Sequence, residues 1–168
     1  TAILSGSNIN PMNHWNKNDS VDYHILDVVV GNTCNLACPF CSPSVSSLIE
    51  KITSSLPDKK SLPGKWGHSA EKNGNPSDVA SIVSEFISNR RVGTLKVIGG
   101  EPLLAENWNE IGKVIDSGVC RDMCLTFTTN ATVMNKKIVD NLYKVKSSNI
   151  TVSLDSIDEN YNFIRWPH

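Results

Sequence analysis

Three cysteines fall within eight residues of the chain, at Cys34, Cys38 and Cys41. Thiolates are soft ligands that hold zinc or iron–sulfur clusters, and three in one short loop can enclose one side of a metal centre. Small zinc sites more often use two separate Cys-x-x-Cys or Cys/His pairs, and the sequence shows no obvious second pair. Three thiolates on a [4Fe–4S] cluster leave one iron open to a substrate or cofactor. The spacing therefore favours a catalytic cluster.

A second candidate feature is the turn Gly99-Gly100-Glu101-Pro102. Neither glycine carries a Cβ atom, so a ligand can approach this backbone closely, and Pro102 stiffens the exit from the turn. An ammonium group suits the bare backbone and the neighbouring Glu101 carboxylate, since it donates hydrogen bonds and carries positive charge. Taken alone, these four residues are more typical of an ordinary tight turn between a strand and a helix.

Four strands are predicted to position these features. The first covers residues 24–30, where a nearly continuous β-branched run suits a strand buried on both faces of a parallel sheet. It ends at Gly31, so the cysteine loop leaves the carboxyl end of a strand, where α/β folds place reactive groups. The other strands are predicted at residues 94–98, 123–128 and 150–154.

Helices are predicted between these strands, which indicates a parallel α/β sheet with right-handed connections. Apolar residues at helical spacing mark them at residues 44–55, from Ser77 to near Asn89, at 108–115 and at 138–142. Because parallel strands end on a common rim, the polar clusters that follow them are expected to lie together. These clusters are the cysteine loop, Gly99 to Pro102, Thr128-Thr129-Asn130, and Ser153 with Asp155.

Composition indicates an ordinary soluble protein. The 168 residues suffice for one core, and 39% hydrophobic with 20% charged residues argues against disorder. A net charge of −1 supplies no bulk field to attract nucleic acid or an anionic membrane. No apolar run of ~18 residues predicts a membrane span, and no leader is evident. The odd count of five cysteines fits a reducing compartment, so a cytoplasmic location is expected.

The predicted domain organisation is a short lead-in followed by one core. Residues 1–20 have no apolar period and are expected to be irregular, whereas residues 21–168 carry the predicted strands and helices. Residues 57–77 are rich in glycine and proline and are predicted to form a long exposed loop. A loop of that length in a compact domain is usually functional or mobile.

The order of these motifs resembles the radical S-adenosylmethionine (radical SAM) superfamily. The cysteine loop follows the first strand and Gly99-Gly100-Glu101-Pro102 follows the second, while Thr128-Thr129-Asn130 and Val152-Ser153-Leu154-Asp155 agree later in the chain. The match covers residues 23–166. The resemblance implies a [4Fe–4S] cluster whose open iron chelates the amino and carboxylate groups of S-adenosylmethionine (SAM). The implied cluster ligands are Cys34, Cys38 and Cys41.

The resemblance also implies which residues contact SAM. Their expected partners differ along the cofactor, from the adenine to the methionine carboxylate. The implied contacts are Phe40 at the adenine, the backbone of Gly99, Gly100 and Glu101 at the ammonium, Ser153 and Asp155 at the ribose hydroxyls, Thr128 and Asn130 along the cavity, and Arg165 at the carboxylate.

A radical reaction is implied by the same resemblance. An electron from a reductant such as flavodoxin or ferredoxin would enter through the cluster and cleave SAM, and the 5′-deoxyadenosyl radical would remove a hydrogen atom from a substrate. Peptide, sugar and lipid substrates are all compatible with this half of the fold. The ending Tyr161-x-Phe163-Ile164-Arg165-Trp166-Pro167 is similar to a stretch of family members with a twitch-type auxiliary cluster domain.

The number of predicted strands departs from the family pattern. The family core is a partial barrel of six βα units, whereas this sequence predicts about four, an incomplete parallel (β/α) barrel. The chain therefore looks like the N-terminal part of the core, and a C-terminal region or a partner chain would complete the barrel. The fourth predicted strand is then expected to expose its edge.

Two other interpretations of the cysteines remain open. A non-catalytic scaffold would keep an iron–sulfur cluster or zinc for structure and would need a partner chain. A thiol redox protein would use Cys38-Pro39-Phe40-Cys41 as a Cys-x-x-Cys pair, but Cys34 would then have no role. Cys120 and Cys124 repeat the Cys-x-x-x-Cys spacing and are expected to pack as small apolar side chains, with Cys124 buried in a strand and Cys120 at a turn.

Overall fold

The computed structural model describes residues 2–5, 23–58, 76–89 and 91–167. Its five strands form one sheet in sequence order, and all neighbouring strands are parallel. The strands are β1 (Ala2–Ser5), β2 (Tyr23–Val29), β3 (Val92–Ile98), β4 (Cys124–Thr129) and β5 (Ser147–Val152). The predicted parallel α/β architecture is therefore confirmed, and the four predicted strands correspond to β2 through β5.

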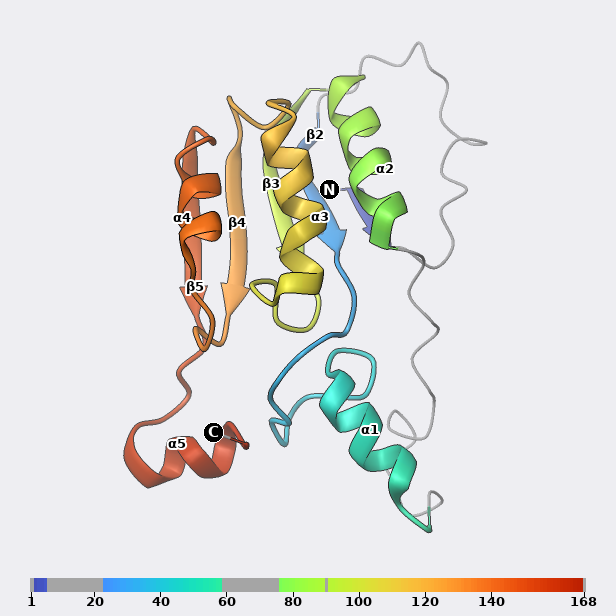
Figure 1. Cartoon of the computed structure of the whole chain (residues 1–168), viewed down its shortest axis with the longest axis vertical. Helices are drawn as coiled ribbons and strands as arrows, with labels where there is room; N and C mark the ends of the chain where they lie inside the picture. The colour runs from blue at the N-terminus through green and yellow to red at the C-terminus, as the bar shows by residue number, and fades with distance from the viewer. Residues whose placement is uncertain (1, 6–22, 59–75, 90, 168) are drawn as a thin grey trace.

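In the described parts of the chain, five helices accompany the sheet, and they form two groups. Figure 1 shows α2, α3 and α4 on one face, whereas α1 and α5 lie beyond the carboxyl ends of the strands. The helices in the described residues are too short or too polar to cross a membrane. They are α1 (Ser47–Ser55), α2 (Pro76–Ser88), α3 (Ala105–Asp116), α4 (Lys136–Leu142) and α5 (Asp158–Ile164).

The hydrophobic core lies between the sheet and the helices α2, α3 and α4. Alternate residues of β2, β3 and β4 point into it, because successive side chains of a strand face opposite sides. The strand residues in the core are Leu26, Val28, Leu95, Val97, Leu125 and Phe127. Trp108 of α3 packs edge-on against Phe127, with 5.5 Å between the ring centroids.

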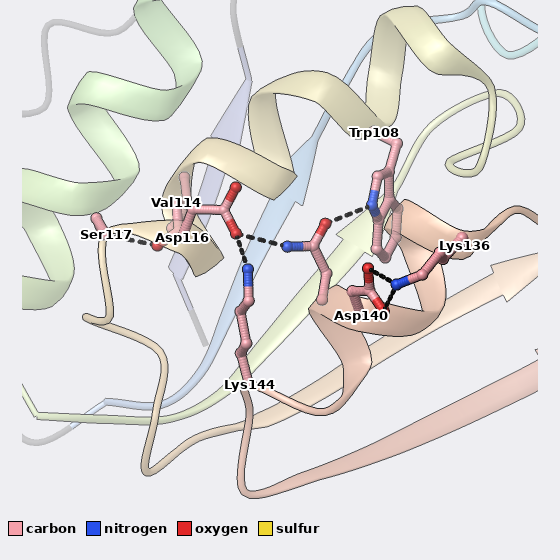
Figure 2. A network of polar contacts seen from close by, with 8 residues as sticks. Trp108, Val114, Asp116, Ser117, Lys136, Asp140 and Lys144 are labelled. Carbon is pink, nitrogen blue, oxygen red and sulfur yellow. Dashed lines mark hydrogen bonds and ion pairs between the residues drawn. The ribbon is translucent and has the colours of Figure 1, made fainter.

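A polar network joins α3 to α4 at the border of this core. The Trp108 indole donates a hydrogen bond of 3.1 Å to the side-chain oxygen of Asn141, and the Asn141 amide donates one of 2.8 Å to Asp116. Lys144 forms an ion pair of 2.6 Å with the same Asp116 oxygen (Figure 2). The network satisfies the polar atom of a buried tryptophan, which otherwise would lose a hydrogen bond on burial.

Two elements were not predicted from the sequence. Residues 2–5 form β1, which pairs with β2 from Ala2 opposite Leu26 to Ser5 opposite Val29. The expected irregular lead-in over residues 1–20 is therefore wrong at this point, because a four-residue strand carries too short a pattern to recognise. Helix α5 was missed because none of its residues is buried, so it has no apolar stripe.

Two predicted segments lie partly outside the described residues. The remainder of the expected lead-in, residues 6–22, lies outside them, and so do residues 59–75 of the predicted loop. At the other side of the sheet, β5 is the last strand and all six of its residues are exposed. The expected open edge at the fourth predicted strand is thus confirmed.

Candidate metal and cofactor site

The carboxyl ends of β2 to β5 form a common rim. The cysteine loop leaves β2, the Gly99 turn leaves β3, and Asn130 follows β4, in neighbouring parallel strands. Ser153 follows β5, and its N–H donates a hydrogen bond of 2.8 Å to the Thr129 carbonyl at the end of β4. The predicted arrangement of these segments on one rim is confirmed.

The cysteine loop is tied to the first turn of α1. Ser46 is the N-cap of this helix, accepting a hydrogen bond of 3.3 Å from Ile49 N–H, and its hydroxyl donates one of 2.7 Å to the Leu36 carbonyl. Ser47 Oγ accepts a hydrogen bond of 3.1 Å from Cys34 N–H. Serine suits both tasks, because one hydroxyl both donates and accepts. The loop is thereby held in a defined conformation.

On its other side, the cysteine loop lies against the turn after β3. Gly100 N–H donates to the Gly31 carbonyl and Glu101 N–H to the Thr33 carbonyl, both at 2.8 Å. A Cβ atom at Gly100 would lie 2.7 Å from the backbone of Asn32, and one at Gly99 would collide with the Gly31 carbonyl oxygen. The absence of a Cβ atom thus admits another segment of the chain itself. The approach of a ligand to the same turn, expected from the sequence, stays a prediction.

The Glu101 carboxylate faces inward and is enclosed by donors of the protein. Its Oε1 atom accepts hydrogen bonds of 3.0 Å from Leu103 N–H and 2.6 Å from the Thr129 hydroxyl, and Oε2 accepts one of 2.6 Å from Asn130 N–H. The side chain is 2% exposed. The predicted ammonium contact of Glu101 concerns its backbone and stays a prediction, whereas its carboxylate is occupied by donors of the protein. Its hydrogen bonds join the ends of β3 and β4.

Two asparagine side chains complete the connection. The Asn107 amide of α3 donates hydrogen bonds of 3.0 Å to the Thr33 carbonyl and 2.7 Å to the Glu101 carbonyl. Asn130 donates one of 3.0 Å to the side chain of Asn35 in the cysteine loop. The expected place of Asn130 along a cavity stays a prediction, and in the structure this residue fixes the loop. The sequence gives no signal for Asn107, since an asparagine in a helix is most often a surface residue.

The three thiols of the loop differ in exposure and lie close enough to affect one another. Cys38 is buried, whereas Cys34 and Cys41 are partly exposed, and all three are free. Burial raises the pKa of the Cys34 thiol, and burial together with the neighbouring Cys38 and Cys34 raises the pKa of Cys41 to about 11. Three thiolates here would repel one another without a positive centre, so the donor set fits a metal cluster.

Zinc and a [4Fe–4S] cluster place different demands on three cysteine ligands. Among the described residues, no three His, Cys, Asp or Glu side chains are arranged around a single ion position. Zinc draws its sulfur ligands to about 2.3 Å. A [4Fe–4S] cluster takes each thiolate on a different iron, so its ligands stand farther apart.

The C-terminal segment returns to the cysteine loop after α5. Ala37 N–H donates a hydrogen bond of 2.6 Å to the Trp166 carbonyl. The Arg165 guanidinium donates one of 3.4 Å to Cys38 Sγ and lies 5.2 Å from the centroid of the Phe40 ring. Its other terminal nitrogen forms an ion pair with Asp155.

The guanidinium of Arg165 therefore contacts three other predicted site residues. Phe40, Asp155, Arg165 and Cys38 were assigned to different parts of SAM or to the cluster, and in the structure they contact each other through Arg165. Thr128 is exposed on β4, and Ser153 is partly buried after β5.

The two remaining cysteines lie away from the loop. Cys120 belongs to the hydrophobic core, where burial raises its pKa to about 11. Cys124, at the start of β4, is only partly buried and lies 3.8 Å from the Thr126 hydroxyl. Packing is confirmed for Cys120, but the expected burial of Cys124 is wrong because its side chain points to the sheet face opposite the core helices.

That opposite face carries a polar row which the sequence analysis missed. Asp27, Lys96 and Thr126 lie in register across β2, β3 and β4. Lys96 Nζ lies 3.6 Å from Asp27 Oδ1, and this oxygen is buried without a hydrogen bond to a described residue. Asp27 and Lys96 alternate with apolar neighbours in their strands, and this alternation was the available signal. The apolar runs around both residues made it hard to recognise.

One protein-family model matches most of the chain. The sequence model described as Radical SAM superfamily matches residues 28–168. GTP 3′,8-cyclase of Thermodesulfovibrio yellowstonii is 30% identical over 146 residues, covering 86% of this chain and 38% of the relative. GTP 3′,8-cyclase 1 of Mycobacterium tuberculosis is 30% identical over 135 residues, covering 79% of this chain and 32% of the relative.

Solved structures with a similar fold include SuiB of Streptococcus suis, in crystals bound to its precursor peptide SuiA and to S-adenosylmethionine. Each has a TM-score of 0.51 and 23% identity and covers 87% of this chain, but only 27% and 28% of the respective SuiB chains. This likeness supports the fold. The chain spans about a third of the length of the curated relatives it matches.

Proposed function

Because the chain belongs to the radical SAM superfamily, we propose that it binds a [4Fe–4S] cluster and SAM at the rim of its sheet and serves as the catalytic core of a radical SAM enzyme. The observation that carries this proposal is the group of three neighbouring thiols at Cys34, Cys38 and Cys41. Their loop is hydrogen-bonded to the Gly99–Pro102 turn, so the two motifs form one site.

When bound, the cluster and SAM would supply the one-electron cleavage that yields a 5′-deoxyadenosyl radical, which takes a hydrogen atom from a substrate. The protein's part is to hold three thiolates in place. Burial opposes the charged form of Cys34 and Cys41, so the iron of a cluster would provide the positive charge that stabilises their thiolates. We propose these three cysteines as the cluster ligands.

For SAM, we propose contacts with the exposed parts of the rim. The carbonyl oxygens of Gly99 and Gly100 accept no hydrogen bond from any residue that the structure describes, so they can accept from the ammonium group. Asp155 binds Arg165 through Oδ2, which leaves Oδ1 for a ribose hydroxyl. The Phe40 ring is 61% exposed and offers an apolar surface to the adenine.

The rest of the proposed cavity follows the sheet face that the core helices leave uncovered. Thr128, on that face of β4, and Ser153, after β5, would line it, with Asn130 fixing its border. We propose that the substrate approaches on the same face, because α2, α3 and α4 cover the other (Figure 1). A flavodoxin or ferredoxin would donate the electron in a reducing, cytoplasmic setting, where thiolates persist.

Anaerobic reconstitution tests the proposal. The protein is incubated with iron and sulfide, and its iron, labile sulfide and zinc contents are measured. After reduction, SAM is added and 5′-deoxyadenosine is quantified by chromatography. We expect a brown iron–sulfur protein that produces 5′-deoxyadenosine, and we expect Cys38→Ala to lose both properties.

Cys120→Ala is the matched control, because it removes a buried thiol away from the loop. It should keep both the cluster and SAM cleavage. One equivalent of zinc with no labile sulfide would instead favour the non-catalytic scaffold. Cluster loading and SAM cleavage that survive in Cys38→Ala would overturn the assignment of this loop.

A further inference from the structure

Arg165 contacts the proposed cluster loop. It follows α5, which lies beyond the carboxyl ends of the strands (Figure 1). The adjacent Trp166 accepts a hydrogen bond of 2.6 Å from Ala37 N–H, so the backbone around Arg165 is docked on the loop. The guanidinium reaches Cys38 Sγ at 3.4 Å, across 127 positions of sequence.

The hydrogen bonding of this guanidinium is incomplete. Arg165 is 7% exposed, one terminal nitrogen binds Cys38 and the other forms an ion pair with Asp155. Its Nε atom is buried and has no hydrogen-bond partner among the described residues. A buried cationic donor is costly unless an acceptor or opposite charge compensates it. The Nε–H group is therefore a spare donor beside a sulfur ligand.

We propose that Arg165 tunes the reduction potential of the cluster, and that Asp155 limits this effect by offsetting part of its charge. This inference rests on the proposed function, since it requires the cluster. It assigns Arg165 to the cluster, whereas the resemblance had implied a contact with the SAM carboxylate.

The direction of the effect follows from charge. Reduction adds one electron, so a nearby positive charge and hydrogen bonds to the ligating sulfur stabilise the reduced state and raise the potential. Removing the guanidinium makes the cluster harder to reduce and leaves Asp155 uncompensated. Removing the Asp155 charge has the opposite effect, because the charge of Arg165 then acts without its partner.

The test is a redox titration of the reconstituted protein without SAM, in which electron paramagnetic resonance (EPR) measures the reduced fraction. For Arg165→Gln we expect the equilibrium to shift about tenfold toward the oxidised cluster, which is about 59 mV for one electron. Asp155→Asn should shift it the other way. Arg165→Lys keeps the charge but lacks the planar fork, so its potential should lie between those of the wild type and Arg165→Gln.

The control is Arg121→Gln, which removes one positive charge before the start of β4, at the end of the sheet opposite the rim. It should leave the potential unchanged. If Arg165→Gln holds a full cluster with the wild-type potential, the inference is wrong while the proposed function stands. If Arg165→Gln does not hold a cluster, the reduction potential of the Asp155→Asn variant decides the matter. A wild-type potential in that variant overturns the inference. A wild-type protein that assembles no cluster refutes both.

Discussion

At the scale of single residues, the site is organised around the buried carboxylate of Glu101. It accepts hydrogen bonds from Leu103, Thr129 and Asn130, and thereby joins the turn after β3 to the end of β4. A glutamate beside two glycines looks like a ligand-binding group in the sequence. In the structure it positions the backbone that a ligand would contact.

Glu101→Gln tests this role. The amide keeps the size of the side chain but turns one acceptor into a donor, so one of the three buried donors is left unsatisfied. We expect a loss of about 2 kcal/mol in the free energy of unfolding, measured by urea denaturation. Glu106→Gln, on the exposed first turn of α3, is the control and should change it little. Equal losses in both variants would contradict the connecting role.

Gly100→Ala probes the contact between the two loops. The added methyl group would lie 2.7 Å from the backbone of Asn32, and a backbone cannot move aside as a side chain can. We expect a loss of about 1–3 kcal/mol in the free energy of unfolding and lower iron uptake during reconstitution.

Gly93→Ala is the matched substitution in β3, where the nearest atom to the new Cβ would be 3.3 Å away. It should take up iron almost as well as the wild type. If Gly100→Ala also assembles a cluster normally, the close approach of the loops does not matter for the site.

The sequence predicts residues whose role is local better than residues whose role depends on distant contacts. The spacing of Cys34, Cys38 and Cys41 identifies the loop because all three lie in one short segment. The contact of Arg165 with Cys38 and the bonds of Asn107 join segments that are far apart in sequence. Such contacts depend on how the elements pack, and no local pattern encodes them.

At the scale of elements, the packing of α3 against α4 depends on a surface charge. Asp116 accepts hydrogen bonds from Lys144 and Asn141, and the hydrogen bond from Lys144 lowers the pKa of this carboxyl below 3.8. A lowered pKa in the folded state means that the interaction stabilises the protein above the unfolded pKa. This stabilisation is lost as the pH falls through the pKa of Asp116 in the folded state.

Asp116→Asn removes this titration. We expect the wild type to lose stability more steeply than the variant as the pH is lowered from neutral to below 3.8, as measured by urea midpoints at a series of pH values. The difference should be small, because Asp116 is exposed and solvent screens its charge. Parallel pH profiles for the two proteins would contradict the contribution of this pair.

Elements with a buried face were predicted well, and elements without one were missed. β3 and β4 carry alternating core residues, and α3 contributes Trp108 and Ile111 to the same core. By contrast, β1 has four residues and α5 buries none, so neither has a pattern that distinguishes it from a loop. Hydrophobic periodicity reports burial, and it is silent where an element lies at the surface.

At the scale of the whole molecule, β5 is an edge of the sheet that the described residues form. All residues of β5 are exposed, including Ile150 and Val152 at 40% and 52%. Unpaired edges with apolar side chains promote pairing with other chains. We expect Ile150→Lys to reduce concentration-dependent self-association in sedimentation experiments, because a lysine on the edge opposes strand pairing.

Tyr143→Lys is the control, since it introduces the same charge at a residue that is 84% exposed but lies at the end of α4. Association that falls equally in both variants would point to net charge and not to the β5 edge. Self-association that neither variant changes would exclude this edge as its cause.

The rim as a whole is proposed to hold a cluster with one iron open to SAM. The most direct measurement compares the EPR spectrum of the reduced, reconstituted protein before and after SAM is added. If the open iron chelates SAM, the spectrum of the cluster should change on addition of SAM. A fully loaded and reduced cluster whose spectrum is identical with and without SAM would contradict the account.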